Sequence, residues 1–269
     1  MSTKLRVTTR YLLMNQLKAL GEAFLAVIAI FIIIPFILAV VSGNLSDFSL
    51  PNTIANFSWG FLIGAFIFLY DSLTYDNFKL FIQNGLSRKT FWAAKIVTTA
   101  IIAVIGELFA AFYRYAISAP IWGISAHAAL MKTPYSLYGN FFGSNVWINI
   151  LVSLLFTIIF FIATGITGMA IGGGLALLSK WGQRIVIVVV PVVAIFLIGF
   201  VGNSSADKQV HYDFTWLANL LKFLIGYPQH EPAIAGSFSP AVPMITMLIG
   251  GAIMAAIAYG FNQLLKVKN

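Results

Sequence analysis

Two charged residues, Glu107 and Arg114, stand inside an otherwise apolar run that extends from about residue 96 to 118. They are seven positions apart, nearly two helical turns, and therefore share one face of a helix. A charge at the centre of a bilayer costs roughly 2.5–3.5 kcal/mol on insertion scales, so a position facing lipid is disfavoured. Arg114 leans toward Glu107, although a direct pair would need both side chains extended. The two residues are interpreted either as a pair that holds helices together or as part of a substrate path or gate.

Other residues with chemical potential stand alone. His127, His211 and His230 lack the spacing of zinc ligands on one helix, so no metal site is predicted. The glycine-rich stretch 172–180 lacks the Gly-Lys pair of a phosphate-binding loop, so the chain has no ATP site of that type. Residues 202–205 come nearest to the serine motif of an intramembrane protease, but no histidine lies in an apolar run. The chain is therefore predicted not to be an enzyme and to bind no cofactor itself.

The composition indicates that these residues are carried by a membrane protein. Hydrophobic residues make up 60% of the 269 positions and charged residues 9%, whereas a soluble domain carries roughly 25% charged residues. The absence of cysteine excludes disulfides, thiol catalysis and thiolate metal sites. The net charge of +8 would suit nucleic acid, but the basic residues form short clusters beside apolar runs. Such clusters orient a protein in a bilayer, and no nucleic-acid partner is predicted.

The apolar runs predict an all-α membrane protein with six transmembrane helices in one domain, residues 1–269. Helices are expected because lipid offers no partner to unpaired backbone groups, and each crossing needs roughly 20 residues. The predicted spans cover about residues 23–41, 54–70, 96–118, 146–171, 185–202 and 242–261.

The basic residues predict that both termini face the cytoplasm of a multi-pass protein of the cell membrane. With this orientation, twelve of the sixteen lysines and arginines are cytoplasmic, three are external and Arg114 lies within a span. The three external ones are Lys132, Lys208 and Lys222. The opposite orientation would reverse this bias.

Three segments between or before the spans are long enough to have roles of their own. Residues 1–20 are predicted to form a helix in the inner membrane interface, with a simple basic flank as the alternative. The apolar external stretch 203–241 suits a re-entrant or interfacial segment. The other external loop, 119–145, contains aromatic residues typical of an interfacial belt: Trp122, Tyr135, Tyr138 and Phe141.

The largest cytoplasmic loop, residues 71–95, is predicted to contain a short helix. Asp71 or Asp76 would cap its start. Asn84 and Gly85 would end it, because these residues tolerate the left-handed conformation of a helix stop. Ser87 is the predicted N-cap of the helix that continues into the third span.

The order of these elements resembles that of the six-helix ABC-2-type permeases, the membrane subunits of ATP-binding-cassette exporters. The closest local similarity is the stretch from Asn84 to Lys95, NGLSRKTFWAAK, which is similar to the segment by which such permeases enter their third span. The resemblance implies that residues 72–86 are a coupling helix that contacts a separate ATPase. The implied contact residues are Asn77, Phe78, Phe81, Ile82, Gln83, Asn84, Gly85, Leu86, Ser87, Arg88 and Lys89. The alternative is that residues 71–95 are only a basic inner loop.

The resemblance further implies a permease subunit that works with a second copy or a sister permease, in contact with membrane lipid. ATP and Mg²⁺ would be bound by the partner ATPase, and a lipid, peptide or drug would move outward. Pro35 and Pro191, in the first and fifth spans, are hinge candidates by this analogy. Two alternatives stay open: a proton-coupled transporter that uses Glu107, and a non-transporting scaffold or immunity protein.

Two Gly-x-x-x-Gly spacings, Gly60 with Gly64 and Gly168 with Gly172, predict close approach of helix backbones. The spacings do not distinguish packing within the chain from packing between two copies.

Overall fold

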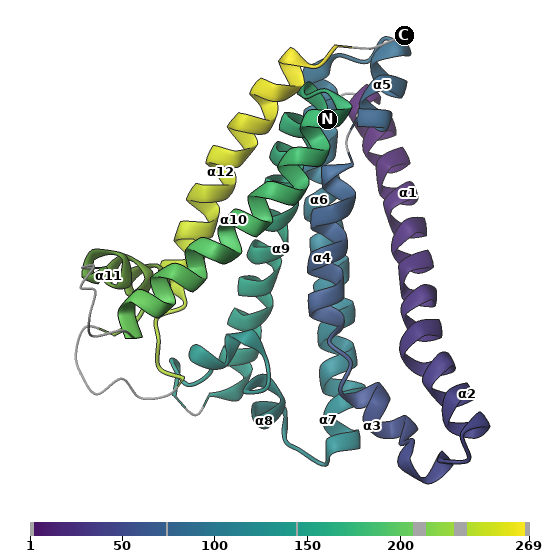
Figure 1. Cartoon of the computed structure of the whole chain (residues 1–269), viewed down its shortest axis with the longest axis vertical. Helices are drawn as coiled ribbons and strands as arrows, with labels where there is room; N and C mark the ends of the chain where they lie inside the picture. The colour runs from purple at the N-terminus through teal and green to yellow at the C-terminus, as the bar shows by residue number, and fades with distance from the viewer. Residues whose placement is uncertain (1–2, 74, 144, 207–213, 229–235, 267–269) are drawn as a thin grey trace.

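The computed structural model describes residues 3–73, 75–143, 145–206, 214–228 and 236–266, and all regular structure in them is helical. His211 and His230 lie outside the described residues. The helices converge at the end of the molecule that holds the start of α1, the end of α12 and α5, and they spread toward the opposite end (Figure 1). The elements in chain order are α1 (Thr3–Ile28), the π-helical turn η1 (Ala29–Ile33), α2 (Ile34–Val41), η2 (Leu45–Asp47), α3 (Leu50–Ala55), α4 (Trp59–Ser72), α5 (Tyr75–Gln83), α6 (Arg88–Phe112), the π-helical turn η3 (Tyr113–Ser118), α7 (Ala119–Trp122), α8 (Ala126–Leu130), η4 (Pro134–Leu137), α9 (Val146–Leu177), α10 (Lys180–Ala206), α11 (Thr215–Leu224) and α12 (Ala241–Leu264).

Five helical stretches among the described residues are long and apolar enough to cross a membrane. They are Thr3–Val41, Arg88–Trp122, Val146–Leu177, Lys180–Phe200 and Ala241–Leu264. The second predicted span corresponds to α4, which has 14 residues and a length of ~21 Å at 1.5 Å per residue. This is less than the ~30 Å of a hydrocarbon core. An all-helical chain with several helices long and apolar enough for a membrane protein is therefore confirmed, while six complete crossings stay a prediction.

The N-terminal segment differs from the prediction, because residues 3–20 do not form a separate interfacial helix. They continue without a break into the first span, as one helical stretch from Thr3 to Val41. Leu12 and Leu20 are buried, so this segment packs on the protein. No proline or turn sequence separates it from the apolar run, which explains why the helix continues.

Pro35 lies in α2, directly after η1. A proline lacks an amide donor and its ring crowds the carbonyl one turn earlier, and a wider π-helical turn accommodates both effects.

The centre of the structure is formed by α4, α6 and α9. Ile63, Ile67, Ile102 and Phe161 are buried together there. Helix α9 crosses α4 at small residues, since a Cβ atom at Gly168 or Gly172 would overlap the backbone carbonyl oxygens of Phe68 and Ser72. This Gly-x-x-x-Gly spacing therefore serves packing within the chain.

The other spacing, Gly60 with Gly64, is used differently. A Cβ at Gly64 would lie 3.1 Å from the Phe161 ring, whereas at Gly60 it would meet only Arg114 Nη2, at 4.0 Å. Gly60 therefore leaves space beside a charged side chain instead of admitting a helix.

Helix α11 lies at the edge of the molecule beside α12, and α10 crosses in front of α9 in the view of Figure 1. The apolar stretch of α10 has no buried residue, in contrast to the third span, where 44% of the most apolar window is buried. Helix α11 has 10 residues, too few to span a bilayer, as the sequence predicted for this segment. Its entry into the membrane stays a prediction.

Candidate functional site

The loop between the second and third spans contains the predicted short helix, α5. It ends as expected: Gly85 has a φ of +77°, and the amides of Gly85 and Leu86 donate to the carbonyls of Ile82 and Phe81, which satisfies the last turn of the helix. Ser87 caps α6, because its hydroxyl accepts from the Thr90 amide at 3.1 Å. The prediction of a helix, a glycine stop and a serine cap is confirmed.

The side chains of α5 divide between an inner and an outer face. Phe78 is fully buried against Phe91 of α6 and Leu265 at the end of α12. Phe81, Ile82 and Leu86, three of the implied contact residues, pack around this cluster. Tyr11 of α1 also contacts the Phe81 ring, at 5.3 Å between centroids. These residues hold α5 on the protein and are not freely available to a partner.

Arg88 ties α5 and α6 to the end of α12. Its guanidinium lies 5.6 Å from the centroid of the Phe78 ring and donates to the carbonyl oxygens of Asn262, at 3.1 Å, and Gln263. The side-chain amide of Asn262 donates back to the Arg88 carbonyl at 2.8 Å. Arg88 thus satisfies carbonyl groups that a helix end leaves unpaired.

The outer face of α5 and of the residue after it includes Asp76, Leu80, Gln83 and Asn84, which follow one another on one helical side and are all exposed. Among the remaining implied contact residues, Gly85, Ser87 and Lys89 are also exposed, and Asn77 is half-buried. Leu80 was not among the implied contact residues, yet 43% of it is exposed. A cavity of about 290 Å³ lies between the start of α1 and the end of α5, and Asn84 is the residue of this face that lines it.

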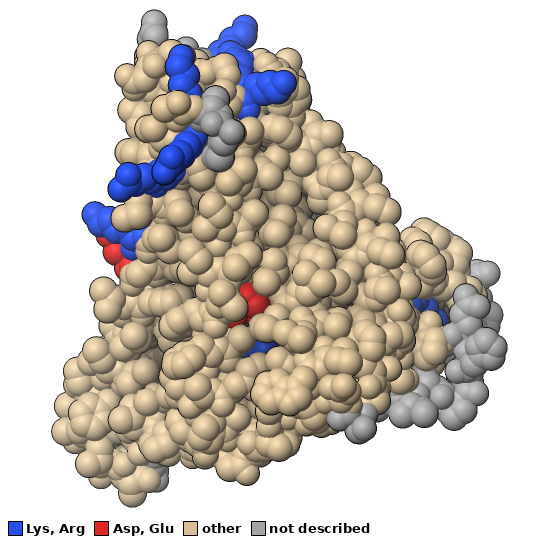
Figure 2. All heavy atoms as spheres, turned by 180° about the vertical axis from the view of Figure 1, so that it is seen from behind, with Lys and Arg blue, Asp and Glu red and all other residues tan. Residues whose placement is uncertain are grey.

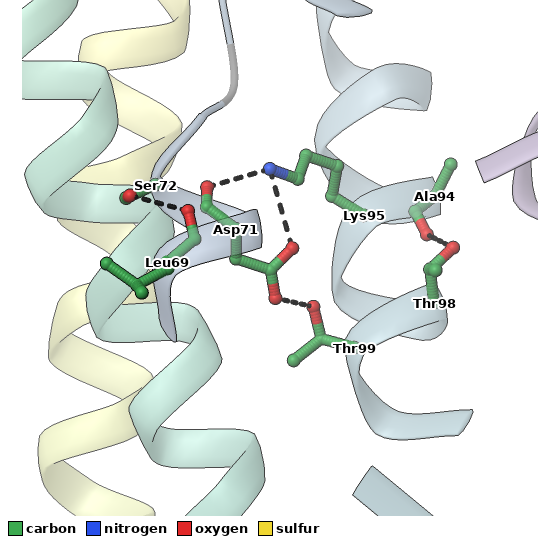
Figure 3. A network of polar contacts seen from close by, with 7 residues as sticks. All are labelled: Leu69, Asp71, Ser72, Ala94, Lys95, Thr98 and Thr99. Atoms are coloured by element: carbon green, nitrogen blue, oxygen red, sulfur yellow. Dashed lines mark hydrogen bonds and ion pairs between the residues drawn. The ribbon is translucent and has the colours of Figure 1, made fainter. Parts of the chain in front are cut away.

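An ion pair that the sequence analysis missed lies under α5. Asp71, near the end of α4, and Lys95, in α6, point toward each other in Figure 3 and are both buried. Lys95 Nζ lies 3.5 Å from Asp71 Oδ1 and donates to the Asp71 carbonyl at 2.9 Å. Thr99 donates to Asp71 Oδ2 at 2.6 Å. A Cβ at Gly165 of α9 would come within 2.8 Å of the same oxygen, so a glycine makes room for the carboxylate.

The position of this pair corrects two predictions. Asp71 is not the cap of α5, because it lies inside α4, and only Asp76 lies in the first turn of α5. Lys95 is not a solvated loop charge, because 4% of it is exposed. The available signal was an acid at the end of one apolar run and a base at the start of the next.

Glu107 and Arg114 share a face of the third span, as predicted, and approach within 3.9 Å, from Arg114 Nη1 to Glu107 Oε1. Glu107 is fully buried, and its carboxylate has no hydrogen-bond partner among the described residues. Arg114 lies in η3, which precedes Pro120 in α7. The wider π-helical turn rotates the side chains that follow it, and such turns are frequent at functional sites.

Arg114 lines a cavity of about 510 Å³ in the half of the molecule away from the termini. The cavity lies among α3, α4, the α6–η3–α7 stretch, α8, η4 and α9, and Lys132 is its second cationic residue. No aspartate or glutamate occurs among the described residues that line it. The wall is otherwise rich in aromatic rings: Phe57, Trp59, Phe61, Tyr113, Trp122, Tyr135, Tyr138, Phe156, Phe160 and Phe161.

Two aromatic residues of this wall carry unpaired donors. Trp59 is 7% exposed and Tyr135 is 2% exposed. Neither the Trp59 indole nitrogen nor the Tyr135 hydroxyl has a hydrogen-bond partner in the part of the chain that the structure describes. Burial raises the pKa of Tyr135 to about 12, so this phenol keeps its proton at neutral pH and can donate a hydrogen bond.

Burial of Tyr135 and Tyr138 does not fit the interfacial belt predicted for residues 119–145, whereas an interfacial position of Trp122 and Phe141 stays a prediction. Trp122, Tyr135 and Tyr138 line the cavity, and the two tyrosines are buried. Lys132 Nζ lies 3.9 Å from the centroid of the Trp122 ring. Phe141 is 42% exposed. The sequence pattern does not separate the two cases, since a lipid-facing ring and a cavity-lining ring have the same composition.

The hinge candidates lie apart from this cavity. Pro191 stands inside α10, which continues through it, and neither it nor Pro35 is among the described lining residues. His127 Nε2 bonds to Asn140 Oδ1 at 3.0 Å. The described residues contain no group of three side chains that could hold a metal ion.

Comparisons with known proteins add no relationship: no family model, curated protein or solved structure matches this chain. The resemblance to ABC-2-type permeases therefore depends on the order of the elements and on residues 84–95.

Proposed function

We propose that this chain is the permease subunit of an ATP-driven exporter of the ABC-2 type, which moves a hydrophobic or amphipathic substrate outward. The observation that carries the proposal is α5. It is a short helix at the end of the molecule that holds both termini, and it has an apolar inner face fixed to the spans and an exposed outer face (Figure 1).

The attachments of α5 suit the transmission of force. Phe81 contacts α1 through Tyr11, Phe78 contacts α6 through Phe91, and Arg88 holds the end of α12. A displacement of α5 would therefore act on three spans at once. In this mechanism, closure of two ATPase subunits pushes α5 of each permease and reorients the spans.

The partner in this mechanism is a cytoplasmic ATPase that binds ATP and Mg²⁺, since the chain lacks a phosphate-binding loop. Basic side chains gather at the end of the molecule where α1 begins (Figure 2), and Lys4, Arg6 and Arg10 are exposed there. This clustering supports a cytoplasmic position of both termini in the cell membrane.

A second permease copy or a sister permease is the other proposed partner. Helix α10 and the part of the first helix around α2 expose large apolar side chains, among them Ile37, Val188 and Phe196. Lipid or a second subunit would cover such a surface.

The test is co-purification of the tagged chain from its own membranes in mild detergent, followed by an assay of ATP hydrolysis. We expect a bound ATPase with the wild type and with Leu178→Asp, and its loss with Leu80→Asp. Leu178 is a matched control, because it is 37% exposed, close to the 43% of Leu80, and lies between α9 and α10. Both variants should insert normally, because neither side chain is buried. A well-folded chain that retains no ATPase, or retains it equally in both variants, would contradict the proposal.

Burial of Glu107 beside a cavity-lining arginine favours a second candidate, a proton-coupled transporter. In that case Glu107→Gln would abolish transport, whereas ATP depletion under a maintained ion gradient would not. Transport that stops on ATP depletion would exclude this candidate.

A further inference from the structure

The cavity of about 510 Å³ presents donors and positive charge but no acidic side chain among its described lining residues. Its volume lies within the ~300–1,000 Å³ typical of small-molecule sites. Arg114 offers up to five N–H groups in a planar fork, and Lys132 offers three on a flexible stem. Trp59 and Tyr135 also line the cavity, and each has a buried donor without a hydrogen-bond partner among the described residues. A ligand that matches this wall carries several acceptor oxygens and a negative charge.

The start of α4 adds to the same preference. The side chain of Ser58, its N-cap residue, makes no capping hydrogen bond, and both Ser58 and Gly60 line the cavity. The Trp59 amide donates to the Phe57 carbonyl at 3.2 Å, but the next amides of the first turn have no partner within the helix and lie at the positive end of its dipole. Gly60 has no side chain, and a Cβ atom built there would lie 4.0 Å from Arg114 Nη2. The guanidinium and the first turn of α4 are therefore neighbours.

The charge of Arg114 is only partly compensated. Glu107 lies 3.9 Å from Nη1, which is too long for a charge-assisted hydrogen bond. Glu107 has no exposed surface and is not a lining residue, so it does not face a ligand. Lys132 is exposed and adds a second positive charge beside Trp122. Two cations and one carboxylate behind them leave the cavity with a net positive charge.

We propose that this cavity binds an anionic amphiphile, with its carboxylate or phosphate head held by Arg114 and Lys132 and its apolar part against the aromatic wall. Aromatic faces accept both acyl chains and rings, so the apolar part is recognised by shape and hydrophobicity. The identification of this ligand as the exported substrate rests on the proposed function. The binding itself does not depend on that function.

Binding can be measured on the purified full chain, without an ATPase, in nanodiscs of phosphatidylcholine. The probes are dansylaminoundecanoic acid and its methyl ester, and the signal is energy transfer from tryptophan to dansyl. We expect saturable binding of the acid and about tenfold or more weaker binding of the ester, because a charge-assisted hydrogen bond contributes about 1.5–3 kcal/mol. Equal binding of acid and ester would overturn the proposal in favour of a neutral hydrophobic ligand.

Variants locate the site. Lys132→Gln should weaken binding of the acid several-fold, whereas Lys222→Gln should not. Lys222 is a matched control, since it also lies over an aromatic ring, 5.3 Å from the centroid of Tyr227, but in α11 and not at the cavity. Arg114→Gln should reduce the affinity by about tenfold or more. Because this change leaves Glu107 buried without a partner charge, it is repeated together with Glu107→Gln to preserve folding. Wild-type affinity in the Lys132 variant and in the double variant would overturn the proposal.

Competitors distinguish the sources of the anion. Displacement of the probe by inorganic phosphate at a similar concentration would show a site for free anions and overturn the amphiphile assignment. Loss of probe affinity in nanodiscs that contain phosphatidylglycerol would show that an anionic lipid of the bilayer is the ligand. Unchanged affinity would show that the ligand is a soluble amphiphile. Both results would support an anionic site. Failure of binding in a chain that still co-purifies with an ATPase would reject this inference and leave the proposed function intact.

Discussion

The buried pair of Asp71 and Lys95 gives a quantitative test of the packing under α5. Lys95→Met removes the ammonium, which contacts Asp71 Oδ1 at 3.5 Å and the Asp71 carbonyl at 2.9 Å, while it keeps an unbranched chain of similar length. The carboxylate is then buried, at 1% exposure, without the charge of the lysine. Removal of one partner from a buried pair costs about 3–5 kcal/mol of the free energy of unfolding.

Asp71→Asn tests the same interaction from the other side. It keeps an oxygen that accepts from Thr99 but leaves the ammonium of Lys95 without its carboxylate, so a loss of similar size is expected. The double variant carries neither charge. Its stability should lie within about 1 kcal/mol of the wild type, because replacement of a whole buried pair is often neutral.

The assay is unfolding in mixed micelles with increasing dodecyl sulfate, followed by tryptophan fluorescence. Thr98→Val is a matched control on α6, because the Thr98 hydroxyl bonds to the Ala94 carbonyl of its own helix at 2.8 Å (Figure 3). Its loss should cost less than about 1 kcal/mol. If the double variant loses as much stability as the two single variants added together, the charges are not coupled and the reasoning is refuted.

Three further predictions concern packing and are measured by the same unfolding assay. Gly172→Ala should lower the free energy of unfolding by about 1–3 kcal/mol or more, because its Cβ would overlap the Ser72 carbonyl. The control Gly250→Ala places its Cβ in open space and should be neutral or slightly stabilising. Equal effects would contradict the close approach of α9 and α4. Phe78→Ala removes a fully buried ring and should lower the free energy of unfolding by about 3–5 kcal/mol, while Leu80→Ala on the exposed face should lower it by about 0.5 kcal/mol or less. A larger loss from Leu80→Ala than from Phe78→Ala would reverse the assignment of the two faces. Tyr135→Phe removes a buried hydroxyl that has no partner among the described residues, so the free energy of unfolding should stay equal or rise by about 1 kcal/mol while binding of the carboxylate probe falls. Unchanged binding would remove this hydroxyl from the site.

The features that the sequence predicted well are those decided within a few neighbouring residues. The apolar runs located the long helices because a bilayer requires about 20 apolar residues in succession. The stop at Gly85 and the cap at Ser87 were predictable because each depends on the conformation or hydrogen bond of one residue. The shared face of Glu107 and Arg114 followed from helical periodicity alone.

The features that the sequence did not predict depend on contacts between distant segments. Asp71 and Lys95 belong to two helices, and their burial depends on the space that Gly165 of a third helix leaves. The role of Arg88 as a cap of α12 joins residues 174 positions apart. Trp122 and Tyr135 have the sequence features of a membrane interface, but the short elements after η3 place them at the cavity beside α4 and α9.

The contact of α9 with the backbone of α4 determines which parts of the chain can shift relative to one another. At Gly168 and Gly172 the two helices meet without intervening side chains, so sliding would cause steric overlap, and we expect them to move as one rigid body. Helix α10 has no buried residue in its apolar stretch and is joined to α9 through a connection at Leu178 and Ser179. In a single copy of the chain we therefore expect α10 and the outer part of the first helix to be held least firmly. Spin labels placed there should report broader distance distributions than labels on α4 and α9.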